Sequence, residues 1–230
     1  MKKDFTLIIP AYNEENRIEQ TLNSIHNSFN DSIDVIIVSN GSIDNTINIL
    51  KKYKLKYKNF DYLDFKEKLG KGGAILEGLK KTRTKYIGFI DADDAFDLIY
   101  IKEIIKDLKN NDVIIASKWK HQSFFEVNEP FLRKIMSRGW NILVKILLKL
   151  NFRDTQAGAK FFKKSAFDKI NTPFISKKFA FDAELLYKFK KNRFFIKEVY
   201  TPSVYKAETT FRFKDIFSMF TDLIKIWWSK

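Results

Sequence analysis

Cysteine is absent from this chain of 230 residues, and histidine occurs only as His26 and His121. Without cysteine there is no disulfide framework, no zinc-thiolate site and no thiol nucleophile, and two histidines leave little room for imidazole chemistry. No window reaches the ~18 uninterrupted apolar residues of a membrane span. The N-terminal apolar run is too short for a signal sequence and is interrupted by Pro10 and Asn13, so we expect a cytoplasmic chain.

Hydrophobic residues and positive charge are both plentiful. Hydrophobic residues make up 45% of the chain and include 23 Phe, enough to fill the core of one domain over residues 1–230. Residues 1–117 contain 18 Lys and Arg and 18 Asp and Glu, whereas residues 118–230 contain 24 and 10, so the net charge of 24 − 10 = +14 lies in the second half. This excess indicates either an anionic partner for that half or a lysine-rich solvated surface.

Short apolar, β-branched runs alternate with helical patterns in the first half. The expected strands are 5–10, 33–38, 60–65, 86–91 and 112–117, and the expected helices are 15–28, 44–54 and 73–82. This alternation predicts an α/β fold, with a Rossmann-like, mainly parallel sheet and helices on both faces. Ligands of such sheets bind beyond the carboxyl ends of the strands, which here read "PAYNEE", "SNGSIDNT" and "DADD".

Three carboxylates, Asp91, Asp93 and Asp94, follow the fourth expected strand within four positions. Like charges this close raise each other's pKa unless a cation, a helix N-terminus or solvent compensates them. An Asp-x-Asp pair offers the hard oxygen ligands that Mg²⁺ or Mn²⁺ prefers. The alternative is that Asp94 or Asp97 caps the next helix. An aspartyl phosphatase is disfavoured, because Ala95 stands where that chemistry needs threonine.

The stretch "LGKGGAILEGL" (69–79) combines a glycine-rich turn, Lys71 and a helix N-terminus. Backbone N–H groups and the helix dipole at such a place bind phosphate. The stretch matches neither the P-loop nor the dinucleotide fingerprint, and a tight turn that needs glycine is the alternative.

Two segments of the second half, 131–150 and 211–230, are basic and amphipathic, and the latter contains the pair Trp227 and Trp228. An apolar stripe on a helix usually packs against the protein's own core. Two basic stripes, one with paired tryptophans, favour the surface of an anionic membrane. We therefore expect C-terminal amphipathic helices that hold the protein on the membrane without crossing it.

The motifs occur in a specific order. "IIPAYNEE", "IIVSNGSIDNT", "GKGGAILEGL" and "YIGFIDADD" together resemble family 2 of the glycosyltransferases, which has the GT-A nucleotide-sugar fold. "LRKIMSRGWNILVKILL", "RDTQAGAKFF" and "FAFDAELLY" resemble its branch that contains dolichyl-phosphate β-glucosyltransferase and dolichyl-phosphate mannose synthase. The resemblance implies inverting transfer of a hexose, from a donor of the UDP-glucose or GDP-mannose type, to a polyprenyl phosphate. It also implies dependence on Mg²⁺ or Mn²⁺ and action at the cytoplasmic face of a membrane.

The motifs and the resemblance together assign site residues in both halves, 1–117 for the nucleotide-sugar and 118–230 for the acceptor and the membrane. The residues assigned to the nucleotide-sugar are Pro10, Ala11, Tyr12, Asn13, Glu14, Asn40, Gly41, Lys71 and Asp91; those assigned to the metal are Asp91 and Asp93; and those assigned to the acceptor are Arg133 and Ser137. Arg133 and Ser137 are one helical turn apart and offer a charged fork and a hydroxyl to one anionic oxygen. The alternative for Arg133 is an ordinary surface ion pair.

The identity of the acceptor decides whether a general base is needed. A phosphate monoester is largely a dianion at pH 7 and attacks without one, so positioning and charge stabilisation by Arg133, the metal at Asp93 and Lys71 would suffice. A sugar hydroxyl, as in the synthesis of a surface polysaccharide, requires a carboxylate base, for which Asp182 is the best candidate, with Asp154 behind it. Both are equally compatible with a structural role. A third hypothesis is an inactive binder of membrane or nucleic acid, but no RNA-binding signature is present and we expect no nucleic-acid partner.

Two positions depart from the family pattern. Ser39 and Asn40 stand where two aspartates are common, and an Asn amide can both accept from and donate to a base, which leaves UDP and GDP undecided. Thr210 stands where the lipid-phosphate branch often has lysine, and Lys206 or Arg212 is the candidate replacement for that charge.

Overall fold

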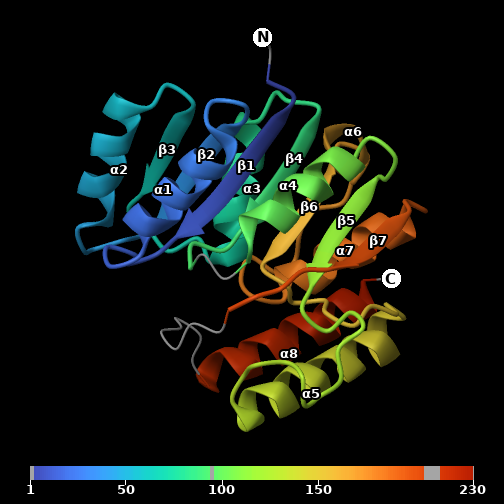
Figure 1. Cartoon of the computed structure of the whole chain (residues 1–230). Helices are drawn as coiled ribbons and strands as arrows, with labels where there is room; N and C mark the ends of the chain where they lie inside the picture. Colours follow the sequence, from blue (N-terminus) through green and yellow to red (C-terminus); the bar gives the residue numbers. More distant parts are fainter. Residues whose placement is uncertain (1–2, 94–95, 205–212, 230) are drawn as a thin grey trace.

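The computed structural model describes residues 3–93, 96–204 and 213–229. A seven-stranded sheet with the order β3-β2-β1-β4-β6-β5-β7 forms the centre of this part of the chain (Figure 1). The strands are β1 (Phe5–Ala11), β2 (Asp34–Asn40), β3 (Phe60–Phe65), β4 (Tyr86–Ile90), β5 (Val113–Ser117), β6 (Ala159–Lys163) and β7 (Ile196–Tyr200). The helices are α1 (Ile18–Phe29), α2 (Thr46–Lys56), α3 (Lys71–Lys81), α4 (Leu98–Asp107), α5 (Phe131–Leu148), α6 (Lys164–Phe167), α7 (Phe181–Lys191) and α8 (Phe213–Trp228).

The prediction of a mainly parallel sheet is confirmed. β1, β2, β3 and β4 pair in parallel, as do β5 and β7, whereas β6 runs antiparallel to both β4 and β5. All five expected strands are present; four lie within one residue of their expected bounds, and β2 ends two residues later than expected. β6 and β7 were not predicted, because "AKFFK" and "IKEVY" are short and each contains lysine. Since β6 lies between β4 and β5, the two halves of the sequence share one sheet.

Helices cover both faces of the sheet, also as predicted. One buried cluster joins the sheet to α1, α2 and α4, through residues such as Leu22, Leu50 and Ile101. The other cluster joins the opposite face to α3, α5, α7 and α8, through residues such as Ile75 and Leu223. Neighbouring residues of β1 enter different clusters, because successive side chains of a strand point to opposite faces.

Aspartate side chains accept hydrogen bonds from backbone amides at the start of two helices. Asp44 accepts from the amide of Thr46 at 3.0 Å at the start of α2, and Asp97 accepts from the amide of Ile99 at 2.8 Å at the start of α4. Capping was the alternative role that the sequence offered for Asp94 or Asp97, and Asp97 has this role. Asp91 and Asp93 are not the cap of α4. Asp94, the other candidate cap, lies outside the described residues.

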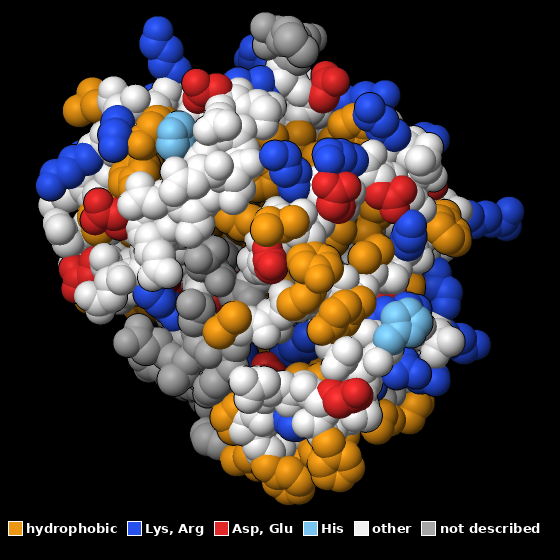
Figure 2. Space-filling model, viewed as in Figure 1, with side chains coloured by type: hydrophobic (Ala, Val, Ile, Leu, Met, Phe, Trp, Pro, Cys, Tyr) orange, Lys and Arg blue, Asp and Glu red, His pale blue; other side chains and the backbone are white. Residues whose placement is uncertain are grey.

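Helices α5 and α8 pack side by side, beneath the sheet in the view of Figure 1. Each buries one stripe, which includes Val144 and Leu148 of α5 and Leu223 and Ile226 of α8. Each also exposes large apolar side chains: Phe131, Leu132, Ile135, Ile142, Leu143 and Ile146 on α5, and Ile216, Phe217, Phe220, Trp227 and Trp228 on α8. Figure 2 shows hydrophobic side chains gathered along the lower edge of this view, over α5. Among the described residues, no helix has the length and apolar character needed to cross a membrane.

Candidate active site

The loops that follow β1 and β2 are joined by hydrogen bonds at the carboxyl edge of the sheet. The amide of Asn13 donates to Ser42 Oγ at 3.2 Å, and Asn13 Oδ1 accepts from the amide of Ile43 at 2.9 Å. The amide of Glu14 donates to Thr46 Oγ1 at 2.8 Å. Asn13 has a φ of 52°, a left-handed conformation that Asn tolerates better than most residues. The segment Pro10–Glu14, assigned to the nucleotide, is thus fixed next to Gly41.

Glu14 is buried at this edge and is paired with an arginine. Its carboxylate accepts from Arg17 Nε at 2.8 Å and from a terminal nitrogen of the same guanidinium at 2.9 Å. Burial raises the pKa of Glu14 to about 7; Arg17 opposes this, and the negative charges of Asp93 and Asp91 add to it. The pKa of Glu14 therefore depends in part on the charges of Asp91 and Asp93, called here the aspartate motif.

Asn40 and the glycine turns form the next part of the edge. Asn40 is 7% exposed and its Oδ1 accepts from the amide of Leu69 at 2.5 Å, whereas its neighbour Ser39 is fully buried. The side-chain oxygen of Asn40 thus holds the backbone just before α3 in place, a role that the sequence did not predict. Gly70 has a φ of 78°, and a Cβ atom there would lie 2.3 Å from the carbonyl oxygen of Lys177. Glycine is required at this turn for both reasons.

Lys71 joins two carboxylates at the carboxyl end of β4. Its Nζ lies 2.9 Å from Oδ1 of Asp91 and 3.1 Å from Oδ2 of Asp182, and these two carboxylates raise the pKa of Lys71 against the opposing effect of burial. The other oxygen of Asp182 lies 2.6 Å from Nζ of Lys160, which also donates to the carbonyl of Ala157 at 2.6 Å. Lys160 is fully buried and Asp182 is 1% exposed. The four charged groups, two positive and two negative, neutralise one another; Lys160 and Asp182 are shielded from solvent, whereas the Asp91 side chain is 37% exposed.

The sequence assigned Asp182 a possible role as general base, and the structure surrounds it with lysines. Its Oδ1 accepts a hydrogen bond from Lys160, its Oδ2 is ion-paired with Lys71, and its side chain is closed off from solvent. A carboxylate held in this way keeps its charge but presents no oxygen to an arriving hydroxyl. This arrangement suits a residue that positions Lys71.

The carboxylates of Asp91 and Asp93 and their surroundings are compatible with a bound divalent cation. Burial raises the pKa of Asp91, Lys71 opposes this, and the nearby charges of Asp93 and Asp182 raise it further, which is the repulsion that a cation would relieve. A Cβ atom at Gly158 would lie 2.0 Å from Oδ2 of Asp91, so glycine leaves the space that this carboxylate occupies. Within the part of the chain described, no group of three or more Asp, Glu, His or Cys is gathered as a ready-made metal site. Two carboxylates completed by substrate phosphates are typical of magnesium.

Arg133 and Ser137 lie on α5, and Arg133 belongs to a separate charged cluster. The carboxylate of Glu129, just before this helix, lies 2.7 Å from Nζ of Lys118 and 3.4 Å from Nε of Arg133. Asp154, the second candidate base, is also buried, with 3% of its surface exposed. Burial raises its pKa, and the positive charges of Lys118 and Lys160 oppose that rise. The carboxyl group of Asp154 therefore interacts both with Lys118, which is paired with Glu129, and with Lys160, which is paired with Asp182.

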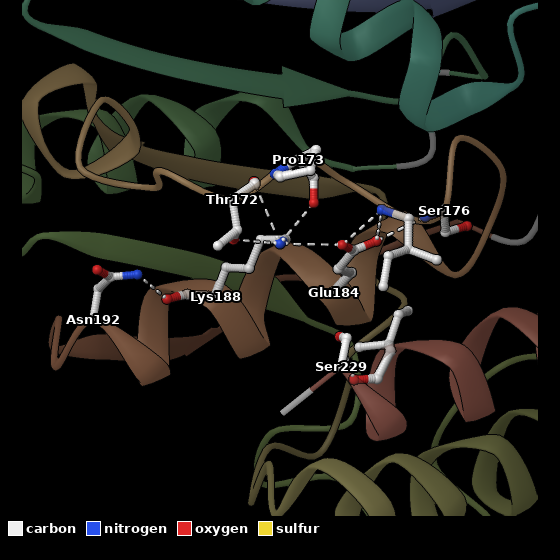
Figure 3. A network of polar contacts seen from close by, with 9 residues as sticks. Thr172, Pro173, Ser176, Glu184, Lys188, Asn192 and Ser229 are labelled. Atoms are coloured by element: carbon white, nitrogen blue, oxygen red, sulfur yellow. Dashed lines mark hydrogen bonds and ion pairs between the residues drawn. The ribbon is translucent and has the colours of Figure 1, made fainter.

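A network at the start of α7 fixes the chain segment behind the glycine turn (Figure 3). The buried carboxylate of Glu184 accepts from the amides of Ile175 and Ser176, and the ammonium of Lys188 donates to Thr172 Oγ1 at 2.7 Å. The same segment supplies the carbonyl of Lys177, which accepts from the amide of Gly73 at 2.9 Å. The network thus holds the surface against which the Gly70 turn packs.

Sequence reasoning did not single out Lys118, Glu129 or Lys160. A signal was available for Lys160, since a lysine between Ala159 and Phe161 interrupts an apolar run and must find a partner if it is buried. Lys118 and Glu129 lie in an irregular segment, where no periodicity indicates which side chains meet. The candidate replacements for the family's lysine, Lys206 and Arg212, lie outside the described residues, as does Thr210.

The fold is the GT-A glycosyltransferase fold. Glucosyl-3-phosphoglycerate synthase from Mycobacterium tuberculosis, solved in complex with Mn²⁺, UDP and glucosyl-3-phosphoglycerate, superposes with a TM-score of 0.72 at 16% identity. The alignment covers 99% of this chain and 79% of that chain. At this identity the likeness shows the fold and nothing further.

The chain belongs to glycosyl transferase family 2, whose model matches residues 6–171. A dolichyl-phosphate beta-glucosyltransferase from Dictyostelium discoideum is 31% identical over 210 residues, which are 84% of this chain and 64% of that protein. A UDP-N-acetylglucosamine--dolichyl-phosphate N-acetylglucosaminyltransferase from Methanococcus voltae is 29% identical over 86% of this chain and 85% of that protein. This chain therefore spans less than two thirds of the Dictyostelium relative's length. The resemblance found in the motifs is confirmed at the level of the family.

Proposed function

We propose that this glycosyltransferase transfers a hexose from a nucleotide-sugar to a polyprenyl phosphate, with inversion at the anomeric carbon. The observation that carries the choice of acceptor is the state of Asp182: both of its oxygens are held by lysines and its side chain is 1% exposed. The best candidate base is thus engaged elsewhere, which favours an acceptor that arrives already deprotonated. The dolichyl-phosphate transferases among the relatives support the same choice.

In this reaction an oxygen of the acceptor phosphate attacks the anomeric carbon, and the bond from that carbon to the donor's diphosphate breaks. The nucleoside diphosphate leaves with the electron pair, and no proton has to be removed from the acceptor. A divalent cation bound with the donor would neutralise charge on the diphosphate. Asp91 and Asp93 are the residues that would hold it, and Mg²⁺ or Mn²⁺ suits their oxygen ligands.

The residues of this chain then have the tasks of binding and orientation. Pro10 to Glu14, Asn40 and Gly41 form the edge proposed for the nucleoside, and the Gly70 turn with the N-terminus of α3 is proposed for the phosphates. Lys71, held by Asp91 and Asp182, places a positive charge between that turn and the aspartate motif. Arg133 and Ser137 on α5 are proposed to bind the acceptor phosphate through charge-assisted hydrogen bonds.

The proposed working place is the surface of an anionic membrane, at its cytoplasmic face. The exposed apolar residues of α5 and α8 support this, because large apolar side chains together on a surface mark an interaction site. The excess of positive charge in residues 118–230 supports an anionic leaflet. The cytoplasmic side follows from the family resemblance and is compatible with the absence of cysteine.

A direct assay tests the proposal. The protein would be incubated with Mg²⁺, a short polyprenyl phosphate and, in separate reactions, UDP-glucose, UDP-N-acetylglucosamine or GDP-mannose, and lipid-linked sugar would be extracted and identified. The matched control is the corresponding polyprenol, which has the same chain and a hydroxyl in place of the phosphate. Product from the phosphate alone supports the proposal. Product from the polyprenol, or from no lipid at all, would replace it with a hydroxyl-acceptor activity or remove it.

A further inference from the structure

Glu129 is a buried carboxylate between two cations at the beginning of α5. Its Oε1 lies 2.7 Å from Nζ of Lys118 and 3.4 Å from Nε of Arg133, and its side chain is 6% exposed. Its second oxygen, Oε2, is buried and has no hydrogen-bond partner among the described residues. A buried carboxylate with one unsatisfied oxygen is costly, so the attraction of the two cations is what keeps Glu129 in place.

The place that Glu129 occupies has the properties of a phosphate site. Helix α5 begins at Phe131, and no side chain caps its first amides. Positive charge and free amides at a helix N-terminus attract anions. The side chain of Arg133 is 44% exposed, so one of the two cations can be reached from solvent while the carboxylate is buried behind it. Glu129 thus stands where an external anion would meet Lys118 and Arg133.

The charges do not balance if the carboxylate and a phosphate are both present. Lys118, Arg133 and Glu129 together give +1 + 1 − 1 = +1, whereas a phosphate monoester contributes about −1.5 to −2 at pH 7. The two cations alone would give +2 and match the dianion. A phosphate that entered beside Glu129 would also meet a like charge in a poorly solvated place, which is strongly unfavourable.

We propose that Glu129 is an internal competitor of the acceptor phosphate. It binds Lys118 and Arg133 while the acceptor is absent, and it leaves them when the phosphate of the acceptor arrives. This inference rests on the proposed function and adds a residue that sets the affinity for the acceptor. Its chemical consequence is that the site favours a dianionic phosphate over singly charged or neutral headgroups, which cannot displace the carboxylate.

The test is the variant Glu129→Gln, titrated by calorimetry first with inorganic phosphate and then with a short polyprenyl phosphate. Glutamine keeps the size and one acceptor oxygen but loses the charge, and neutral hydrogen bonds are weaker than charge-assisted ones. We expect both anions to bind about five- to tenfold more tightly than to the unchanged protein, with UDP binding unaltered. A role limited to positioning Arg133 predicts the opposite sign, because the cations would lose their holder and bind phosphate more weakly.

Glu126→Gln is the matched control. Glu126 lies in the same segment, is exposed, and accepts from the amide of Ser123 at 2.6 Å, so its replacement removes the same charge without touching Lys118 or Arg133. Phosphate affinity should change less than twofold in this variant. An equal gain in both variants would mean that bulk charge alone is responsible and would overturn the proposal, as would unchanged or weaker binding to Glu129→Gln.

A second variant covers the case in which the first does not fold. Glu129→Asp keeps the charge but shortens the side chain, so that it cannot hold both cations at once, and a gain of about two- to threefold is expected. The two proposals also fail separately. If neither the unchanged protein nor the variants transfer sugar to lipid phosphate, the proposed function is wrong, while the titration with inorganic phosphate still decides the role of Glu129.

Discussion

The ammonium group of Lys71 lies 2.9 Å from the carboxylate of Asp91, so the glycine turn before α3 is joined to the aspartate motif after β4 by one ion pair. The two residues are 20 positions apart and come from adjacent crossovers of the sheet. The pair explains how like charges accumulate at the end of a buried strand: a lysine from the neighbouring turn compensates one of them. It also places Lys71 between the turn that is proposed to bind phosphate and the two carboxylates.

Lys71→Met should destabilise the fold. The change leaves Asp91 without a described cation and Asp182 with Lys160 alone, and removing one member of a buried pair costs about 3–5 kcal/mol. Urea denaturation followed by circular dichroism would measure the difference. Lys81→Met, on the exposed side of the same helix, should change stability by less than about 0.5 kcal/mol. Equal stabilities of the two variants would show that the Lys71 ion pairs contribute nothing net.

Asp93→Asn should abolish the dependence of donor binding on a divalent cation. An amide is a neutral and weaker ligand for Mg²⁺ than a carboxylate, and Asp91 alone is already shared with Lys71. Calorimetry with UDP-glucose or GDP-mannose, with and without Mg²⁺ or Mn²⁺, would measure the effect, and turnover should fall with it. The expectation is wrong if the unchanged protein binds and turns over its donor equally well in the presence of a chelator.

The pKa of Glu14 predicts a pH dependence of stability. Burial raises this pKa from 4.5 to about 7 in the folded protein, so the folded state holds the proton more tightly than the unfolded chain. The contribution to stability is therefore complete below about pH 4.5 and is lost as the pH rises through about 7. Relative to Glu14→Gln, the unchanged protein should lose about 2–3 kcal/mol between pH 5 and pH 8, since one pKa unit corresponds to about 1.4 kcal/mol. Urea denaturation of both proteins at several pH values would measure it, and a constant difference would show that Arg17 keeps Glu14 ionised throughout.

Five strands of the sheet could be predicted because each is a short apolar, β-branched run, a pattern that is visible in the local sequence. Runs such as "VIIV" are apolar and β-branched wherever they occur, and the motifs at their ends gave the carboxyl edge. The pairing of β6 between β4 and β5 was not predictable, since a strand order is set by contacts between distant segments. The same reason applies to the site: Asp182 and Asp91 were both identified, but only the fold shows that Lys71 binds both and that Lys160 satisfies the remaining oxygen.

Arg133→Ala should impair use of the acceptor far more than binding of the donor. A charge-assisted contact to phosphate contributes about 1.5–3 kcal/mol, so the KM for a short polyprenyl phosphate should rise roughly ten- to hundredfold. Donor affinity should remain within a factor of two, because Arg133 is paired with Glu129 in the part of the chain proposed for the acceptor. A loss of donor affinity with unchanged acceptor kinetics would contradict the division into two sites. Lys134→Ala, next to it on α5, is the control for a general loss of positive charge.

Binding to a membrane surface should depend on the exposed face of α8 and not on its buried face. Leu223 and Ile226 are buried in the core, so removal of the whole C-terminal segment is expected to destabilise the fold and is not a clean test. Phe217 and Trp228 are instead 75% and 79% exposed and can be changed without opening the core. Burial of one such side chain contributes about 1.5–3 kcal/mol, so Phe217→Ser and Trp228→Ser should each weaken binding to vesicles at least tenfold.

The experiment separates the apolar contribution from the electrostatic one. Vesicles of phosphatidylcholine with phosphatidylglycerol would be sedimented with each protein at low and high salt. Added salt should weaken the binding of every variant, because each Lys or Arg near an anionic leaflet contributes about 1 kcal/mol only while screening is weak. The loss caused by the serine variants should persist at high salt, because apolar burial does not depend on charge. Leu55→Ser, which changes a side chain that is 90% exposed on α2, should bind as the unchanged protein does. If the α8 variants also bind normally, α8 is a core helix only, and membrane contact must come from the exposed residues of α5.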